Sequence, residues 1–168
     1  MKYRIPERIT SDRLILRKPM ANDWEELHRY YSDENSMRYT IGHALEDWET
    51  WRNVALMIGH WEIRQYGPYV MEISDKVIGV TGLWFPYGWP EPEIKWGLLP
   101  DARGDGYARE GAEAVLLMAA QYLPDLHLIS LIHPDNQNSV KVATGIGAVY
   151  EKTIPFRGEV AAVYRHKK

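Results

Sequence analysis

RGDGYA, at residues 103–108, is the stretch that most constrains the fold, because it separates an apolar strand-like segment from the most regular helical pattern in the sequence. Its two glycines allow the backbone NH groups of a turn to point toward one place. The helix that follows adds free NH groups and the positive end of its dipole. Arg103 and Arg109 would bring guanidinium groups nearby. The stretch therefore suits a phosphate or pyrophosphate, although glycine turns ahead of helices commonly bind nothing.

Two familiar nucleotide-binding motifs do not fit this stretch. A dinucleotide fingerprint requires a third glycine where Arg109 stands, and an early strand-helix-strand unit that the chain lacks. Gly106 and Gly111 have the spacing that opens a P-loop, but Ala112 and Glu113 occupy the places of its Lys and its Ser or Thr. The stretch therefore indicates neither a nicotinamide site nor an NTPase.

Helical spacing predicts four helices. The first begins at Asp23, which with Glu26 resembles a capping box. The second runs from about residue 45 to residue 65 and the third over residues 108–123, where alanines indicate close approach to a sheet; a short fourth helix ends near residue 146. The spacing of the second helix is carried by Trp48, Trp51, Ala55 and Ile58.

Short apolar and β-branched segments predict about seven strands, at residues 13–17, 69–73, 77–84, 93–99, 128–132, 149–154 and 159–165. The continuous apolar run at 128–132 is typical of a central strand that is buried on both faces. The order of strands and helices predicts one domain, residues 1–168, of the mixed α/β (α+β) class. Its core would be one largely antiparallel sheet with about four helices.

The composition excludes several classes of protein. A hydrophobic fraction of 45% and a charged fraction of 26% are ordinary for a globular chain and unlike those of disordered ones. The net charge of −3 offers no general attraction to nucleic acid or to an anionic membrane. The chain has no cysteine, which fits a reducing compartment, and its six histidines show no metal-ligand spacing. We therefore expect a cytoplasmic protein that acts without a metal, nucleic acid or membrane.

Five segments together resemble the GNAT superfamily of N-acetyltransferases, and in particular its RimJ/RimL-like branch, which acetylates the α-amines of ribosomal proteins. Residues 103–108 match the Arg/Gln-x-x-Gly-x-Gly/Ala signature of the superfamily. The other segments are SDRLILR at 11–17, GLW at 82–84, GYARE at 106–110 and HPDNQNS at 133–139. The resemblance spans nearly the whole chain. It implies that the fourth and fifth strands splay apart and that the pantetheine arm of acetyl-CoA lies in the gap.

The same resemblance implies the residues of the site. Asn136 matches the position that hydrogen-bonds the arm, and Ser139 matches the hydroxyl that protonates the departing thiolate. Glu93 matches a strand position where several members keep a general base. The cofactor-binding residues that it implies are Leu98, Arg103, Gly104, Gly106, Tyr107, Ala108 and Asn136.

Each of these residues also has an ordinary structural interpretation. Asn136 could cap a helix, Ser139 could be a polar first-turn residue, and Glu93 could be a solvated strand residue. Ala143 stands where many superfamily members have a tyrosine, which leaves Ser139 or water as the proton donor. The aromatic loop at residues 85–89 and the segment at residues 37–43 are expected to line the acceptor side.

The implied activity is transfer of acetyl from acetyl-CoA to a primary amine by direct attack. Roughly one α-amine in seven is neutral at pH 7, against about one lysine in 2,500. A peptide or protein α-amine, or a small amine of low pKa, is therefore easier for Glu93 to deprotonate than a lysine side chain. A non-catalytic acyl-CoA binding or sensing domain and a nucleotide enzyme of another fold are the alternatives. The chain could act as a monomer or a homodimer.

Overall fold

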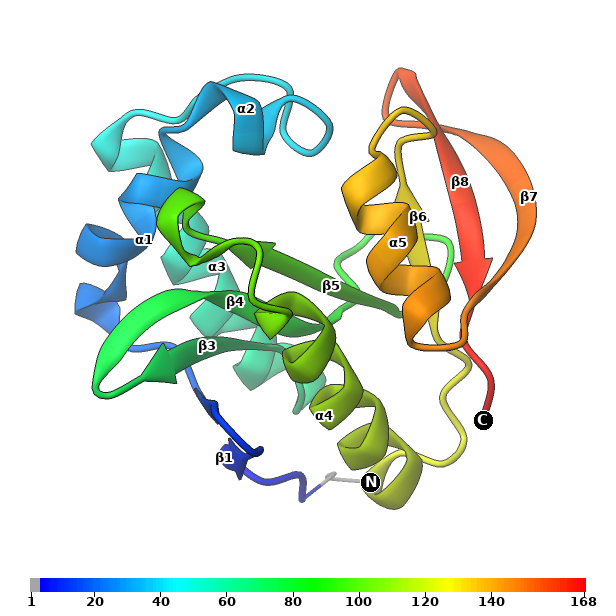
Figure 1. The fold of residues 1–168 in the computed structure, drawn as a ribbon, viewed down its shortest axis with the longest axis horizontal. Coiled ribbons are helices and arrows are strands. Elements are labelled where there is room, and N and C mark those ends of the chain that lie inside the picture. Colours follow the sequence, from blue (N-terminus) through cyan, green and yellow to red (C-terminus); the bar gives the residue numbers. More distant parts are fainter. Residues whose placement is uncertain (1–3) are drawn as a thin grey trace.

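The computed structural model describes residues 4–168 as one eight-stranded sheet with helices on both of its faces (Figure 1). Residues 1–3 of the expected domain lie outside the described part. The strands are β1 (Arg8–Thr10), β2 (Ile15–Arg17), β3 (Pro68–Ile73), β4 (Lys76–Trp84), β5 (Glu93–Leu98), β6 (Ile129–Ile132), β7 (Val149–Phe156) and β8 (Glu159–Arg165). Their order in the sheet is β1-β2-β3-β4-β5-β6-β8-β7. The mixed, mostly antiparallel class is confirmed, with β1 as an additional strand.

The helices are α1 (Trp24–Tyr31), α2 (Glu34–Met37), α3 (Asp47–Arg64), α4 (Tyr107–Tyr122) and α5 (Gln137–Gly145), with short 3-10 turns at Ala21–Asp23 and Pro100–Ala102. The four-residue α2 was not expected. Among the helices of residues 4–168, none has the length and apolar character that a membrane crossing requires.

The interpretation of Asp23 as a capping residue of α1 was wrong. Its side chain makes no capping bond to that helix. The carboxylate accepts two hydrogen bonds from the guanidinium of Arg17, at 2.9 and 2.8 Å, and one from the backbone NH of Met20 at 2.6 Å. Asp23 thus ties the start of α1 to strand β2.

Close approach of α4 to the sheet is confirmed at Gly111. A Cβ atom at this position would lie 2.7 Å from Sδ of Met71 and 3.1 Å from Cγ2 of Thr81, so only glycine fits between helix and sheet. On the opposite face Gly97 of β5 lies against α1, because a Cβ there would lie 2.4 Å from the ring of Tyr30. The sheet is therefore packed closely by α4 at β3 and β4 on one face and by α1 at β5 on the other.

The residues whose spacing predicted α3 do not together form its buried side. The sheet side is formed by Thr50, Val54, Met57, His60 and Trp61. Trp48 and Trp51 keep 52% and 53% of their surface exposed. Helical spacing found the helix correctly, but α3 carries apolar residues on both sides, so spacing alone does not show which side is buried.

Candidate active site

The two central strands part as expected. Strands β5 and β6 are parallel neighbours, and they share a single residue pair, Glu93 with Ile129, at the start of both. Every other neighbouring pair of strands in the sheet is antiparallel. Beyond that pair the strands diverge, and Figure 1 shows α5, β6, β7 and β8 standing apart from the rest of the molecule. The β6 side of β5 is consequently open toward Leu98.

The glycine turn at residues 103–108 follows the open end of β5. Gly104 and Gly106 have φ angles of +95° and +81°, which favour glycine. Gly106 is the N-cap of α4 and supplies no side-chain cap. Within residues 4–168, no backbone NH group from Gly104 through Ala108 donates a hydrogen bond to the protein. These free NH groups and the start of α4 form a candidate anion site.

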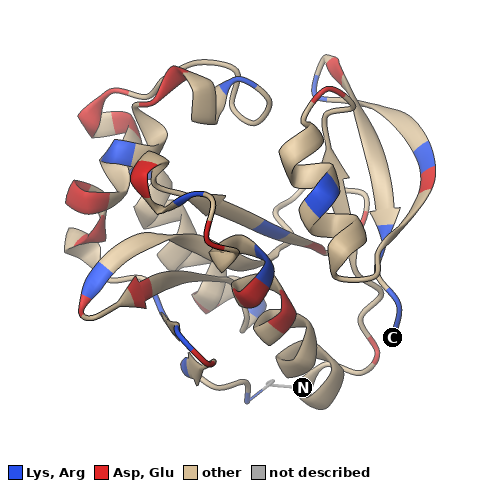
Figure 2. Cartoon of the chain, viewed as in Figure 1, with Lys and Arg blue, Asp and Glu red and all other residues tan. Residues whose placement is uncertain are grey.

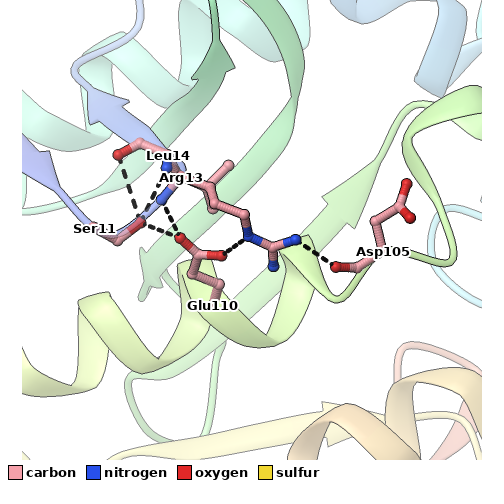
Figure 3. Close-up of polar contacts among 5 residues, drawn as sticks. All are labelled: Ser11, Arg13, Leu14, Asp105 and Glu110. Atoms are coloured by element: carbon pink, nitrogen blue, oxygen red, sulfur yellow. Dashed lines mark hydrogen bonds and ion pairs between the residues drawn. The ribbon is translucent and has the colours of Figure 1, made fainter.

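A lock formed by Ser11, Arg13 and Glu110 holds the turn in place (Figure 3). The guanidinium of Arg13 donates to the backbone oxygen of Asp105 at 2.8 Å and to the carboxylate of Glu110 at 2.7 Å. The hydroxyl of Ser11 and the backbone NH of Arg13 also donate to Glu110, each at 2.7 Å. Burial alone would raise the pKa of Glu110, but these hydrogen bonds outweigh it and hold the pKa below its ordinary value.

Sequence reasoning missed the role of the lock although its signal was present. Two of the matched segments, at residues 11–17 and 106–110, contain its three side chains. Their hydrogen bonds join positions up to 99 residues apart.

The two arginines of the turn have other partners in this structure. Arg103 donates to the hydroxyl of Ser36 on α2 and, at 3.4 Å, to the backbone oxygen of Leu98. Arg109 pairs with Glu113 one helical turn further along α4, at 3.0 Å. Both arginine side chains are exposed. A bound anion could attract them only by drawing them from these contacts.

Side chains replace backbone pairing at the point where the strands part. The carboxylate of Glu93 accepts from the backbone NH of Leu131 at 3.2 Å. The hydroxyl of Ser130 donates to the backbone oxygen of Ile94 at 2.7 Å. Ser130 therefore accepts from Nε2 of His166, 2.8 Å away. Ser130 was the one polar residue in an apolar strand, which is the signal that sequence reasoning passed over.

Glu93 is buried at the closed end of the gap, so the interpretation as a solvated residue was wrong. Its carboxylate, 8% exposed, also accepts from Nε1 of Trp89 at 2.8 Å. Burial raises the pKa of Glu93 above its ordinary value, with the Trp89 hydrogen bond opposing the rise. Lys95 lies on the same side of β5, with its Nζ 4.0 Å from the centre of the Trp84 ring. Burial lowers the pKa of Lys95 to about 8, against the attraction of Glu93.

Asn136 and Ser139 lie beyond the other end of β6, in the first turn of α5. The side-chain oxygen of Asn136 caps the helix by accepting from the backbone NH of Ser139 at 3.4 Å, as its structural interpretation predicted. The hydroxyl of Ser139 is half-buried and has no hydrogen-bond partner within residues 4–168. Ala143 is fully buried against Ile132. No hydrogen bond links Ser139 to Glu93 in the described part of the chain, and the two residues belong to opposite ends of the gap.

Aromatic contacts cross from one half of the sheet to the other. Tyr39, in the loop after α2, stacks on His133 after β6, with ring centres 5.0 Å apart. Trp89 packs edge-on against Phe156 of β7 at 5.1 Å. Tyr87 of the same loop is fully exposed. The 37–43 segment and Trp89 thus both bridge the halves, while Tyr87 faces solvent.

No group of three or more His, Cys, Asp or Glu residues that could hold a metal ion occurs within residues 4–168.

Comparison with known proteins agrees with this architecture. A profile described as Acetyltransferase (GNAT) domain matches residues 13–149. A protein named Uncharacterized N-acetyltransferase YnaD, from Bacillus subtilis (strain 168), is 27% identical over 151 residues, which cover 88% of each chain. A crystal structure of an acetyltransferase from Agrobacterium tumefaciens str. C58 is 26% identical with a TM-score of 0.85, and the match covers 100% of this chain and 98% of that one.

The fold and these matches define an acetyltransferase. The chain belongs to the GNAT acetyltransferase family, as its motifs predicted. RimL, the ribosomal L7/L12 alpha-N-protein acetyltransferase solved in complex with coenzyme A, is 19% identical with a TM-score of 0.76 over 96% of each chain. The expected likeness to the RimJ/RimL-like branch is thus found at the level of the fold.

Proposed function

We propose that the chain transfers acetyl from acetyl-CoA to a primary amine, either the α-amine of a peptide or protein or a small amine. The observation that carries this proposal is the row of free NH groups at residues 104–108 beside the open side of β5. An extended ligand with a pyrophosphate at one end needs both features, an anion site and a strand edge. The fold shared with RimL in complex with coenzyme A supports the choice of ligand.

The proposed binding residues follow from this geometry. The NH groups of Gly104, Gly106, Tyr107 and Ala108 would bind the pyrophosphate, and the backbone of Leu98 would pair with the arm. Arg103 would turn from Leu98 toward a phosphate oxygen, a short movement for an exposed side chain. The amide nitrogen of Asn136 is available for the arm, because its oxygen alone caps α5.

Acetyl-CoA supplies the acetyl group as a thioester, and the chain has to position the amine and move two protons. Holding two reactants in an attack geometry is worth up to roughly 7–11 kcal/mol. Glu93, with its raised pKa, would accept the proton of the attacking amine through intervening water, because it lies at the closed end of the gap while Ser139 lies at the other. Ser139, whose hydroxyl has no other partner in the described residues, would protonate the sulfur that leaves. A thiol and an amide are the products.

The charge distribution supports an amine as acceptor. Acidic residues of α1, of α2 and of the start of α3 gather on one side of the molecule (Figure 2). A cationic amine would be drawn toward this side before it loses its proton. We also propose that the protein is cytoplasmic.

The decisive experiment measures thiol release from acetyl-CoA with a panel of peptides that differ at the N-terminal residue, together with small amines. Release that depends on one class of amine, with an acetylated product seen by mass spectrometry, is expected. Tight binding of acetyl-CoA without release above hydrolysis would replace the proposal with a non-catalytic acyl-CoA sensor. Binding of ATP or NAD in preference to coenzyme A would reject both.

A further inference from the structure

The outer side of α3 is apolar although it faces solvent. Trp48, Trp51 and Leu56 are 52%, 53% and 52% exposed, and Ile63 is 80% exposed. An ordinary surface helix places charged and polar residues on this side. Here the outer side carries only Arg52 and Glu62 as charged residues between Trp48 and Ile63.

The exposed apolar area on the outer side of α3 is large enough for a protein interface. A tryptophan buries up to about 250 Å², so half-exposed Trp48 and Trp51 present roughly 130 Å² each. Leu56 and Ile63 add a similar amount, which brings the apolar surface to about 500 Å², the size of the largest patches on soluble monomers. Two such surfaces brought together bury about 1,000 Å², near the lower limit of a specific protein interface.

The charged residues on this side are arranged so that a second copy fits. Arg52 and Glu62 lie five residues on either side of Met57, about 7.5 Å along the helix axis in each direction. When two copies of α3 run antiparallel about that level, each Arg52 lies beside Glu62 of the other copy. Within residues 4–168 neither side chain forms an ion pair, and Arg52 only stacks over Trp48, 5.3 Å from its ring centre.

Small residues occupy the centre of this arrangement. Ala55 and Gly59 lie two residues on either side of Met57 and face outward, and nothing lies within 4 Å of a Cβ built at Gly59. A glycine inside a helix costs about 1 kcal/mol relative to alanine. Two helices can approach closely where such residues face each other, which gives Gly59 a role that packing within one chain does not.

We propose that the outer side of α3 is a dimer interface, in which two copies of the chain pair antiparallel through a twofold axis near Met57. The apolar contact comes from Trp48, Trp51, Leu56 and Ile63. Arg52 of each copy forms an ion pair with Glu62 of the other copy, which gives two ion pairs in the dimer. Tryptophan and arginine are the residues most often found at the centres of interfaces. The inference does not depend on the proposed function, because α3 lies away from the glycine turn and its NH groups.

Charge reversal tests the pairing directly. Arg52→Glu and Glu62→Arg each place like charges opposite one another at two sites in the dimer, so each variant alone should weaken the dimer at least tenfold. An equimolar mixture of the two variants restores Arg-Glu pairs at both sites, and it should form a heterodimer. Oligomeric mass is measured by sedimentation velocity and native mass spectrometry at about 10 μM chain.

Matched controls are Glu159→Arg on β8 and Lys76→Glu at the start of β4, two exposed positions that lie neither on α3 nor on α1, which packs against it. Both should leave the dimer intact. Ile63→Asp should also weaken the dimer, because it removes apolar contact while both Arg52–Glu62 ion pairs remain. A wild-type chain that is monomeric at 100 μM, or a dimer unaffected by both reversals, would overturn the proposal. A mixture that stays monomeric would refute the antiparallel register.

Discussion

Replacing Ser130 by alanine should destabilise the fold and close part of the gap between β5 and β6. Ser130 is 2% exposed, and its hydroxyl joins the backbone oxygen of Ile94 to the imidazole of His166. Burial lowers the pKa of His166 to about 4, so the ring is neutral and has one NH to donate. That NH is on Nε2, since Nδ1 is the buried atom without a partner in the described residues. Alanine therefore leaves both a carbonyl and an NH without their partner.

The size of the effect follows from these two groups. A buried polar group that loses its partner costs about 1–3 kcal/mol. The NH of Leu131 can shift from Glu93 onto the oxygen of Ile94 and recover part of the loss, which leaves a net destabilisation of about 3 kcal/mol. For a chain of 168 residues, 1 kcal/mol lowers Tm by about 2–4 °C, so the expected decrease is about 6–12 °C.

The assay combines urea unfolding with hydrogen exchange at the amide of Leu131. In Ser130→Ala this amide should become more protected relative to global stability, because it joins the extended ladder. Ser130→Thr retains the hydroxyl and should recover most of the stability, while Ser32→Ala, at an exposed position after α1, controls for the loss of a hydroxyl. A Ser130→Ala protein within about 0.5 kcal/mol of the wild type would refute this account of the parted strands.

Three further predictions concern the turn and the first turn of α5. Gly106→Val should weaken acetyl-CoA binding by calorimetry more than tenfold, because the side chain enters the anion site; Gly158→Val, at φ +80° in a distant turn, controls for strain. Ser139→Ala should lower kcat at least tenfold with little change in the Kd of acetyl-CoA, and an unaltered kcat would leave Ser139 a helix residue. Glu110→Gln should lower the free energy of unfolding at pH values above 4.5, the ordinary pKa of a glutamate. The difference from the wild type should vanish as the pH falls through the lower pKa that Glu110 has in the folded chain, and denaturant unfolding at several pH values measures it.

Much of the fold could be predicted because its periodicities are local. The hairpin of β3 and β4, the Ala-rich α4 and the apolar β6 were identified within a few residues of their observed bounds. The three-residue β1 and four-residue α2 are too short for any period to show. The buried side of α3 could not be predicted because both sides are apolar, and only the position of the sheet decides between them.

The candidate site was predictable in part for the same reason. The glycine turn is encoded in six consecutive residues, and its positive φ angles at Gly104 and Gly106 follow from them. The lock between Arg13 and Glu110 and the bonds from Ser130 depend on contacts between distant segments. Sequence spacing gives the residues of such contacts but not their partners.

The turn and the parted strands solve one physical problem in the same way. A ligand that is recognised through backbone groups requires those groups to be left unpaired, so the backbone beside them has to be held by other contacts. Arg13 therefore holds the oxygen of Asp105, and Ser130 and Glu93 serve the backbone of Ile94 and Leu131. Glu93 thus has a structural duty apart from any proton transfer. A loss of activity in Glu93→Ala would report on both roles, and only the pH dependence of kcat in Glu93→Gln, which keeps one acceptor oxygen, can separate them.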